Sequence, residues 1–125
     1  MKPLLFAYGT LREASKLQEA RFLRASAKRI ARAKLPARLY DLGEYPGVRY
    51  SRKKTDRVVG EVFELTENPR AVLKYLDAYE GEEYVRKKYL VELETGGKVE
   101  AWVYEYVGPL DGKRLIASGD YLKAG

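Results

Sequence analysis

The sequence contains no cysteine and no histidine. Disulfide bonds, thiol nucleophiles and zinc sites built on thiolate or imidazole are therefore excluded. A catalytic triad that depends on histidine is excluded as well. Any acid–base chemistry in this chain must use the side chains of Asp, Glu, Lys or Tyr.

Long apolar runs are also missing, because the longest are about the length of one β-strand. None is long enough to cross a bilayer as a helix, and the four apolar residues after Met1-Lys2-Pro3 are too few for a signal peptide. We therefore expect a soluble, cytoplasmic protein with no membrane partner. Charged residues make up 34% of the chain while Gln18 and Asn68 are its sole side-chain amides, which is a thermophile-like bias.

The formal net charge is +6 and the isoelectric point is about 9.4. Such a charge permits a phosphate-bearing partner, and the 11 tyrosines could stack on single-stranded bases. The alternatives are a solvated surface of ion pairs and tyrosines that pack on sheet faces. We favour these alternatives because the glycine motifs that bind nucleotide phosphates are absent, as is any RNA-binding signature. A nucleic-acid partner is therefore not favoured.

No internal repeat, linker or low-complexity segment interrupts the chain, so residues 1–125 are predicted to form one domain. Apolar alternation and short apolar runs predict strands, and helical spacing predicts helices. The predicted strands cover residues 3–8, 28–40 with an edge or a bend at Pro36, 57–65 with a bulge or close packing at Gly60, and a hairpin of 83–95 and 98–107.

The predicted helices are few and peripheral. One is weakly patterned over residues 13–27, and the other starts with Asn68 as N-cap and Pro69 at its first position. Residues 41–48 are predicted as a shaped loop because they gather Gly43, Pro46 and Gly47. This order of elements predicts an α+β fold with a curled or closed sheet.

The stretch LLFAYGTLRE, residues 4–13, is the first candidate site. An apolar strand ends there at Tyr8-Gly9-Thr10-Leu11, and glycine beside small polar residues suits a loop whose backbone amides face a ligand. An ordinary turn is the alternative.

The second candidate is LDAYEGEEYVR, residues 76–86, where a helix gives way at Gly81. Glu80 is expected at the helix C-terminus, whose negative end raises a carboxyl pKa, and burial or the neighbouring Glu82 and Glu83 would raise it further. Glu80 is then a candidate proton acceptor tuned toward neutral pH. The alternative is a solvated acidic cluster paired with nearby lysine or arginine.

Five motifs occur in order along the chain: YGTLR, LYDLGEYPGV, VVGEVFEL, LDAYEGEEYVRK and AWVYEYV. In this order they resemble the γ-glutamylcyclotransferase-like (AIG2-like) family, and especially its short branch similar to γ-glutamylamine cyclotransferase. The resemblance covers essentially the whole chain. It implies a small mixed, largely antiparallel β-barrel with a few peripheral helices, and a small-molecule γ-glutamyl substrate that is cyclised to 5-oxoproline without cofactor or metal.

The resemblance also assigns residues. It implies that Glu80 is the general base and that Tyr8, Gly9, Thr10 and Leu11 grip the glutamyl group. Tyr84 and Arg86 alternate with Val85, so they share one sheet face and are candidates to line the pocket, with a structural role as the alternative. Tyr45, with Pro46 and Gly47, is a candidate for a pocket wall, with a rigid turn as the alternative. Asp77 is interpreted as support for the helix or loop. A non-catalytic module that binds a small metabolite or RNA is the rival function.

Overall fold

The computed structural model describes residues 2–9, 18–53 and 55–123. The strands within these residues are β1 (Leu4–Ala7), β2 (Ala27–Leu35), β3 (Ala37–Asp41), β4 (Pro46–Tyr50), β5 (Val58–Leu65), β6 (Tyr84–Leu93), β7 (Lys98–Tyr106) and β8 (Arg114–Leu115). The helices are α1 (Gln18–Ser26), α2 (Pro69–Glu80) and the short 3-10 helix η1 (Tyr121–Lys123). Among the described residues, no helix is long and apolar enough to cross a membrane.

The strands form a closed, mixed barrel with an extension. Antiparallel pairing runs in the order β1, β5, β2, β6 and β7, and a parallel contact of β1 with β7, at Leu5 opposite Trp102, closes the ring. Beyond β7 the sheet continues through β4, β3 and β8, with β4 again parallel to β7. The largely antiparallel barrel expected from the sequence is therefore confirmed.

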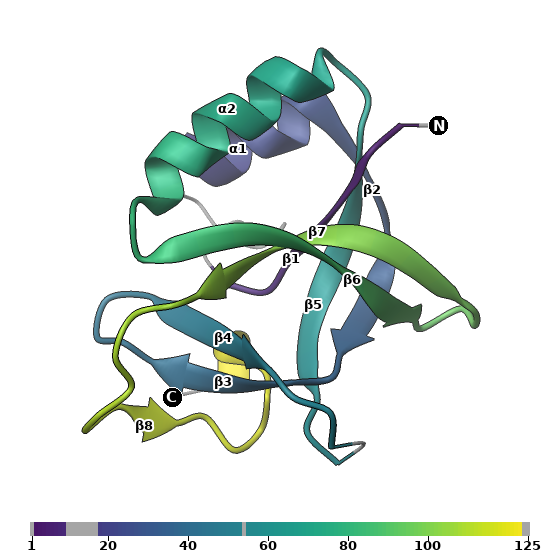
Figure 1. Ribbon diagram of the computed structural model, residues 1–125. Helices are drawn as coiled ribbons and strands as arrows, with labels where there is room; N and C mark the ends of the chain where they lie inside the picture. Colours follow the sequence, from purple (N-terminus) through teal and green to yellow (C-terminus); the bar gives the residue numbers. More distant parts are fainter. Residues whose placement is uncertain (1, 10–17, 54, 124–125) are drawn as a thin grey trace.

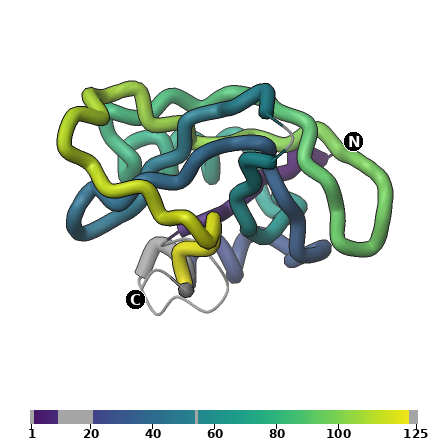
Figure 2. The backbone as a smooth tube through the Cα atoms, turned by 90° about the horizontal axis from the view of Figure 1, so that it is seen from below, coloured from purple at the N-terminus to yellow at the C-terminus, as the bar shows by residue number. Residues whose placement is uncertain are grey.

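The two helices lie together on one side of the barrel, and β3, β4 and β8 lie at the opposite end (Figure 1). Seen from below, the C-terminal segment in yellow crosses the underside of the molecule, where β8 pairs with β3 (Figure 2). The turn between β6 and β7 projects from one side in both views. The helices therefore cover one side of the barrel, and the sheet extension of β3, β4 and β8 lies at the opposite end (Figure 1).

Strand alternation divides the apolar residues into two clusters. On β1, Phe6 joins the barrel interior while Leu5 and Ala7 face the helices. The same division applies to β7, where Val103 faces inward and Tyr104 faces outward toward α2. The helices therefore pack on the outer face of the same strands that fill the barrel.

Helix α2 begins and ends as its sequence predicts. Asn68 takes the left-handed conformation with φ of 41°, and its side chain accepts a hydrogen bond from the Ala71 N–H, so the predicted N-cap is confirmed. The helix ends at Gly81, where φ is 85° and the N–H donates to the Asp77 carbonyl oxygen at 3.2 Å. Because the helix ends at Gly81, Glu80 is its last residue and lies at its C-terminal end.

Two predicted boundaries are wrong. The strand expected over residues 28–40 is two strands, because Pro36 separates β2 from β3 and sends the chain from the barrel into the extension. The loop expected over residues 41–48 is shorter, since β4 already starts at Pro46. Proline and glycine argue locally against a strand, but the parallel contact of β4 with β7 overrides that preference.

Two other expectations are resolved by packing. At Gly60 a Cβ atom would lie 2.5 Å from the Ala7 carbonyl oxygen, so this glycine serves close packing, and the bulge lies in β2 near Ile30. Of the weakly patterned helix, residues 18–26 form α1, and the start of that prediction lies outside the described residues.

Candidate active site

A small cavity opens where segments far apart in the sequence converge. Its lining comes from the end of β1, the start of β4 with the residue before it, the last residue of α2, the first residue of β6, and β7. The lining residues are Phe6, Ala7, Tyr8, Gly9, Tyr45, Pro46, Glu80, Tyr84 and Tyr104. The structure thus places two predicted regions, Tyr8-Gly9 and Glu80, on the same cavity.

Glu80 is the one carboxyl group on this described lining. It is partly buried, and burial raises its pKa from 4.5 to about 7. Sequence reasoning also expected the helix end and the neighbouring Glu82 and Glu83 to raise this pKa. In the structure burial is the cause, and both neighbouring glutamates are exposed.

Glu80 differs from the buried carboxylates in having no partner among the described residues. Glu105 accepts hydrogen bonds from the Tyr89 hydroxyl at 2.6 Å and the Tyr50 N–H at 2.7 Å, and Glu61 pairs with Arg29 at 2.7 Å. Across the described residues, no hydrogen bond or ion pair reaches the Glu80 side chain. A carboxylate that is desolvated but uncommitted is free to accept a proton from a ligand.

Three tyrosines surround Glu80, and each donates its hydroxyl hydrogen elsewhere. Tyr8 donates to the Tyr104 carbonyl oxygen at 2.6 Å, and Tyr84 donates to the Pro46 carbonyl oxygen at 2.7 Å. Tyr104 donates to the Asp77 carboxylate at 2.7 Å. Burial raises the pKa of all three tyrosines, so they stay neutral around Glu80 at physiological pH.

Gly9 brings the end of β1 against β4. A Cβ atom at this position would lie 2.6 Å from Cγ of Pro46, closer than side-chain atoms pack. This contact explains why glycine follows Tyr8 at the cavity wall. Thr10 and Leu11, the other two residues expected in this loop, lie outside the described residues.

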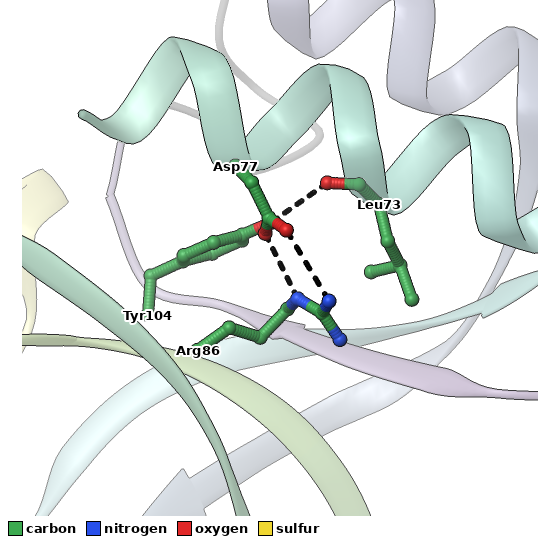
Figure 3. A network of polar contacts seen from close by, with 4 residues as sticks. All are labelled: Leu73, Asp77, Arg86 and Tyr104. Atoms are coloured by element: carbon green, nitrogen blue, oxygen red, sulfur yellow. Dashed lines mark hydrogen bonds and ion pairs between the residues drawn. The ribbon is translucent and has the colours of Figure 1, made fainter. Parts of the chain in front are cut away.

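The structure places the three lesser candidates differently. Tyr84 and the exposed Tyr45 line the cavity, and their rings are 6.4 Å apart. Arg86 does not line it. Its Nε and Nη2 atoms donate to the two carboxylate oxygens of Asp77 at 2.8 and 3.2 Å (Figure 3). The Arg86 guanidinium also lies 4.2 Å from the centre of the Trp102 ring.

Sequence reasoning missed Tyr104 as a cavity residue. It lies in the predicted strand 98–107, but local alternation cannot show that this strand meets β1. Pro46 was expected with Tyr45 and Gly47 as a candidate pocket wall, and in the structure Tyr45 and Pro46 line the cavity. The motif order in the sequence is the one signal that groups these segments.

Two other chemistries find little support. No cluster of three or more acidic residues in the described part of the chain could hold a metal ion. The basic residues that would carry a phosphate-binding surface include Arg29 and Arg32, which pair with Glu61 at 2.7 Å and Asp120 at 3.5 Å. These ion pairs reduce the positive charge that β2 presents.

The fold defines a class of proteins. It resembles the crystal structure of an AIG2-like protein from Mus musculus, with a TM-score of 0.71, 24% identity, and coverage of 88% of this chain and 81% of that one. It also resembles the solution structure of ytfP from Escherichia coli, with a TM-score of 0.65, 33% identity and 96% of both chains covered. The class is the AIG2-like barrel.

The sequence comparisons identify the family. The family model described as "Gamma-glutamyl cyclotransferase, AIG2-like" matches residues 5–123, so the chain belongs to this family. Escherichia coli YtfP, a gamma-glutamylcyclotransferase family protein, is 41% identical over 86 residues, which are 67% of this chain and 66% of that one. A Methanocaldococcus jannaschii relative is 41% identical over 71 residues, which are 55% of each chain. The match thus spans between half and two thirds of these relatives.

Proposed function

We propose that the protein cyclises a γ-glutamyl compound to 5-oxoproline and releases a free amine or amino acid, with Glu80 as the general base. The observation that carries the proposal is the Glu80 carboxylate, which has no partner among the described residues and lines the same cavity as Tyr8 and Gly9. Its pKa of about 7 suits a group that must take up and return a proton near neutral pH. Family membership supports the same reaction.

The reaction needs one proton relay and no external reactant. Glu80 takes a proton from the substrate's α-ammonium group, and the amine nitrogen then attacks the δ-carbonyl carbon of the same molecule. A new C–N bond closes the five-membered ring. The original C–N bond breaks as Glu80 returns the proton to the leaving nitrogen. The ring nitrogen then loses its second proton through Glu80 to the departing amine, which leaves as an ammonium ion. The glutamyl acyl group is thus transferred from one nitrogen to another.

Positioning supplies the rest of the catalysis, because nucleophile and electrophile belong to one molecule. In this proposal the backbone amides around Gly9, Thr10 and Leu11 hold the substrate's α-carboxylate or the developing oxyanion, where fixed donors contribute most. Tyr45 and Tyr84 form a further part of the cavity wall. The neutral tyrosines around Glu80 limit water access and leave the carboxylate as the one base in the described cavity.

The test is turnover of a panel of γ-glutamyl amines, γ-glutamyl amino acids and glutathione, with 5-oxoproline measured by mass spectrometry. We expect product from the wild type, a rate that rises with pH through about 7, and a loss of at least about 100-fold in Glu80→Gln. Glu82→Gln is the matched control, since this exposed glutamate lies two residues away and is not on the described lining of this cavity.

Each result has a distinct meaning. Equal product from the wild type and Glu80→Gln would keep the reaction but remove Glu80 as its base. No product from any substrate would overturn the cyclotransferase proposal and favour a module that binds a small metabolite without converting it.

A further inference from the structure

Two carboxylates lie one turn apart on α2, and they differ in the hydrogen bonds that they accept. Asp77 and Glu80 are three positions apart, so their side chains lie on the same side of the helix. Asp77 accepts three hydrogen bonds, two from Arg86 and one from the Tyr104 hydroxyl (Figure 3). Glu80 accepts none from the described residues. One carboxylate, although exposed, therefore has three hydrogen-bond donors, while the one a turn later, on the cavity lining, has none among the described residues.

Tyr104 connects this engaged carboxylate to the far wall of the cavity. Its hydroxyl donates to Asp77 at 2.7 Å, and its carbonyl oxygen accepts the Tyr8 hydroxyl hydrogen at 2.6 Å. Arg86 is itself held against Trp102 of β7. The last turn of α2 is thus connected through β6 and β7 to the end of β1.

We infer that Asp77 and Arg86 form a positioning pair, which holds the last turn of α2 against the barrel and keeps the charge beside Glu80 balanced. This inference rests on the proposed function and assigns neither residue contact with the substrate. The pair has two separable effects. Its hydrogen bonds fix where the Glu80 carboxylate lies, and its opposite charges cancel so that neither acts on Glu80.

The groups that face or adjoin Glu80 come from every element around it. On the cavity lining they are Tyr8 after β1, Tyr45 before β4, Tyr84 of β6 and Tyr104 of β7. Outside the lining they are Asp77 of α2 with its partner Arg86 of β6, and Glu83 in the turn after α2. Burial keeps Tyr8, Tyr84 and Tyr104 neutral. Glu83 is exposed and accepts a hydrogen bond from the Tyr106 hydroxyl at 3.3 Å. Removing one member of the Asp77–Arg86 pair therefore leaves the other as a new unbalanced charge near Glu80.

The two single variants should move the titration of Glu80 in opposite directions. Asp77→Asn leaves the Arg86 cation uncompensated, which favours the carboxylate and lowers the pKa of Glu80 by about half to one unit. Arg86→Gln leaves the Asp77 anion uncompensated and raises that pKa by a similar amount. In Asp77→Asn/Arg86→Gln both charges are gone, so the pKa should return close to the wild-type value.

Turnover should depend on the hydrogen bonds of the Asp77–Arg86 pair and not on its charge balance. We expect kcat to fall about tenfold or more in both single variants and to stay low in the double variant, with KM changed less than about threefold. Arg86→Lys keeps the charge but loses the paired donors. Compared with Arg86→Gln, it should therefore bring the pKa of Glu80 back close to the wild-type value while kcat stays low.

The experiment is an NMR titration of the Glu80 carboxyl carbon in the wild type and the four variants, with kcat and KM measured on the γ-glutamyl panel. Asp56→Asn is the matched control, because Asp56 also pairs with an arginine, Arg38 at 3.1 Å, and a hydroxyl, Ser51 at 2.6 Å, but lines no part of the cavity. It should change neither readout. Thermal unfolding shows which variants are folded at the assay temperature.

Opposite pKa shifts that cancel in the double variant, with kcat still low, are the expected result. Shifts of the same sign, no shift, or an equal effect in Asp56→Asn would overturn the inference. The titration does not require turnover. A wild-type protein that converts no substrate but shows the opposite shifts would therefore reject the proposed reaction while supporting the charge balance at Glu80.

Discussion

The hydroxyl of Tyr8 donates to the carbonyl oxygen of Tyr104 at 2.6 Å, and this buried hydrogen bond joins residues 96 positions apart in the chain. The bond lies beside the parallel contact of β1 with β7 that closes the barrel. Both residues also line the candidate active site. Closure of the sheet and formation of the cavity therefore depend on the same pair of strands.

Tyr8→Phe should destabilise the protein by about 1–3 kcal/mol, because it leaves the buried carbonyl oxygen of Tyr104 without its donor. The ring and its packing are retained, so the loss reports on the hydrogen bond. Urea unfolding followed by circular dichroism measures it. Tyr121→Phe is the control, because the exposed Tyr121 hydroxyl donates to the Glu44 carbonyl oxygen over the longer distance of 3.4 Å. Equal losses of stability in the two variants would contradict the prediction.

The raised pKa of Glu80 should make stability depend on pH. The folded protein keeps the Glu80 proton up to a pH of about 7, whereas the unfolded chain releases it near 4.5. The free energy of unfolding of the wild type should therefore fall by up to roughly 3 kcal/mol as the pH rises from about 4.5 to about 7.

Glu80→Gln has no proton to lose at this position. Its stability relative to the wild type should therefore increase between pH 4 and pH 8, as measured by urea unfolding at each pH. Glu82→Gln removes an exposed charge and should run parallel to the wild type. A Glu80→Gln curve that is also parallel to the wild type would show that the Glu80 carboxyl is not desolvated.

Gly9→Ala should disturb the cavity wall, because the new Cβ atom would lie 2.6 Å from Cγ and 3.1 Å from Cδ of Pro46. We expect a destabilisation of about 1–3 kcal/mol and a fall in kcat of at least about tenfold. Pro46→Ala removes both ring atoms, so Gly9→Ala/Pro46→Ala should recover most of the lost stability. A double variant no more stable than Gly9→Ala would show that this contact is not the cause.

Asn68→Ala should cost about 1 kcal/mol or more of unfolding free energy. The substitution removes the side-chain acceptor for the Ala71 N–H and places alanine at a φ of 41°. Asn68→Gly also loses the acceptor but tolerates positive φ, so its loss should be a few tenths of a kcal/mol. Thermal denaturation of both variants separates the two effects, and equal losses would assign the whole cost to the cap.

Local features of the fold could be predicted from the sequence because their causes are local. The N-cap at Asn68, the apolar face of α2 and the hairpin around Gly96-Gly97 each depend on residues close together in the chain. The break at Pro36 was expected as an edge or a bend, but the sequence does not show that β2 and β3 join different neighbours.

The candidate site was predictable only where a motif marked it. Tyr8-Gly9 and Glu80 were identified as separate stretches, and the family resemblance connected them. Burial of Glu80 depends on Tyr8, Tyr84 and Tyr104 arriving from three strands, and the contact of β1 with β7 that brings them together is one pair of residues long. The partners of Arg86 likewise come from α2 and β7, so its position away from the cavity could not be read from alternation on β6.

Closure of the barrel by its first and seventh strands also has a consequence for synthesis on the ribosome. β1 emerges first, yet its partner β7 spans Lys98–Tyr106. A nascent chain halted after β6 already carries Tyr8, Glu80 and Tyr84, but not the Tyr104 carbonyl oxygen that receives the Tyr8 hydroxyl hydrogen. The cavity therefore cannot form until β7 has been synthesised, because both its lining and the hydrogen bond of Tyr8 require Tyr104.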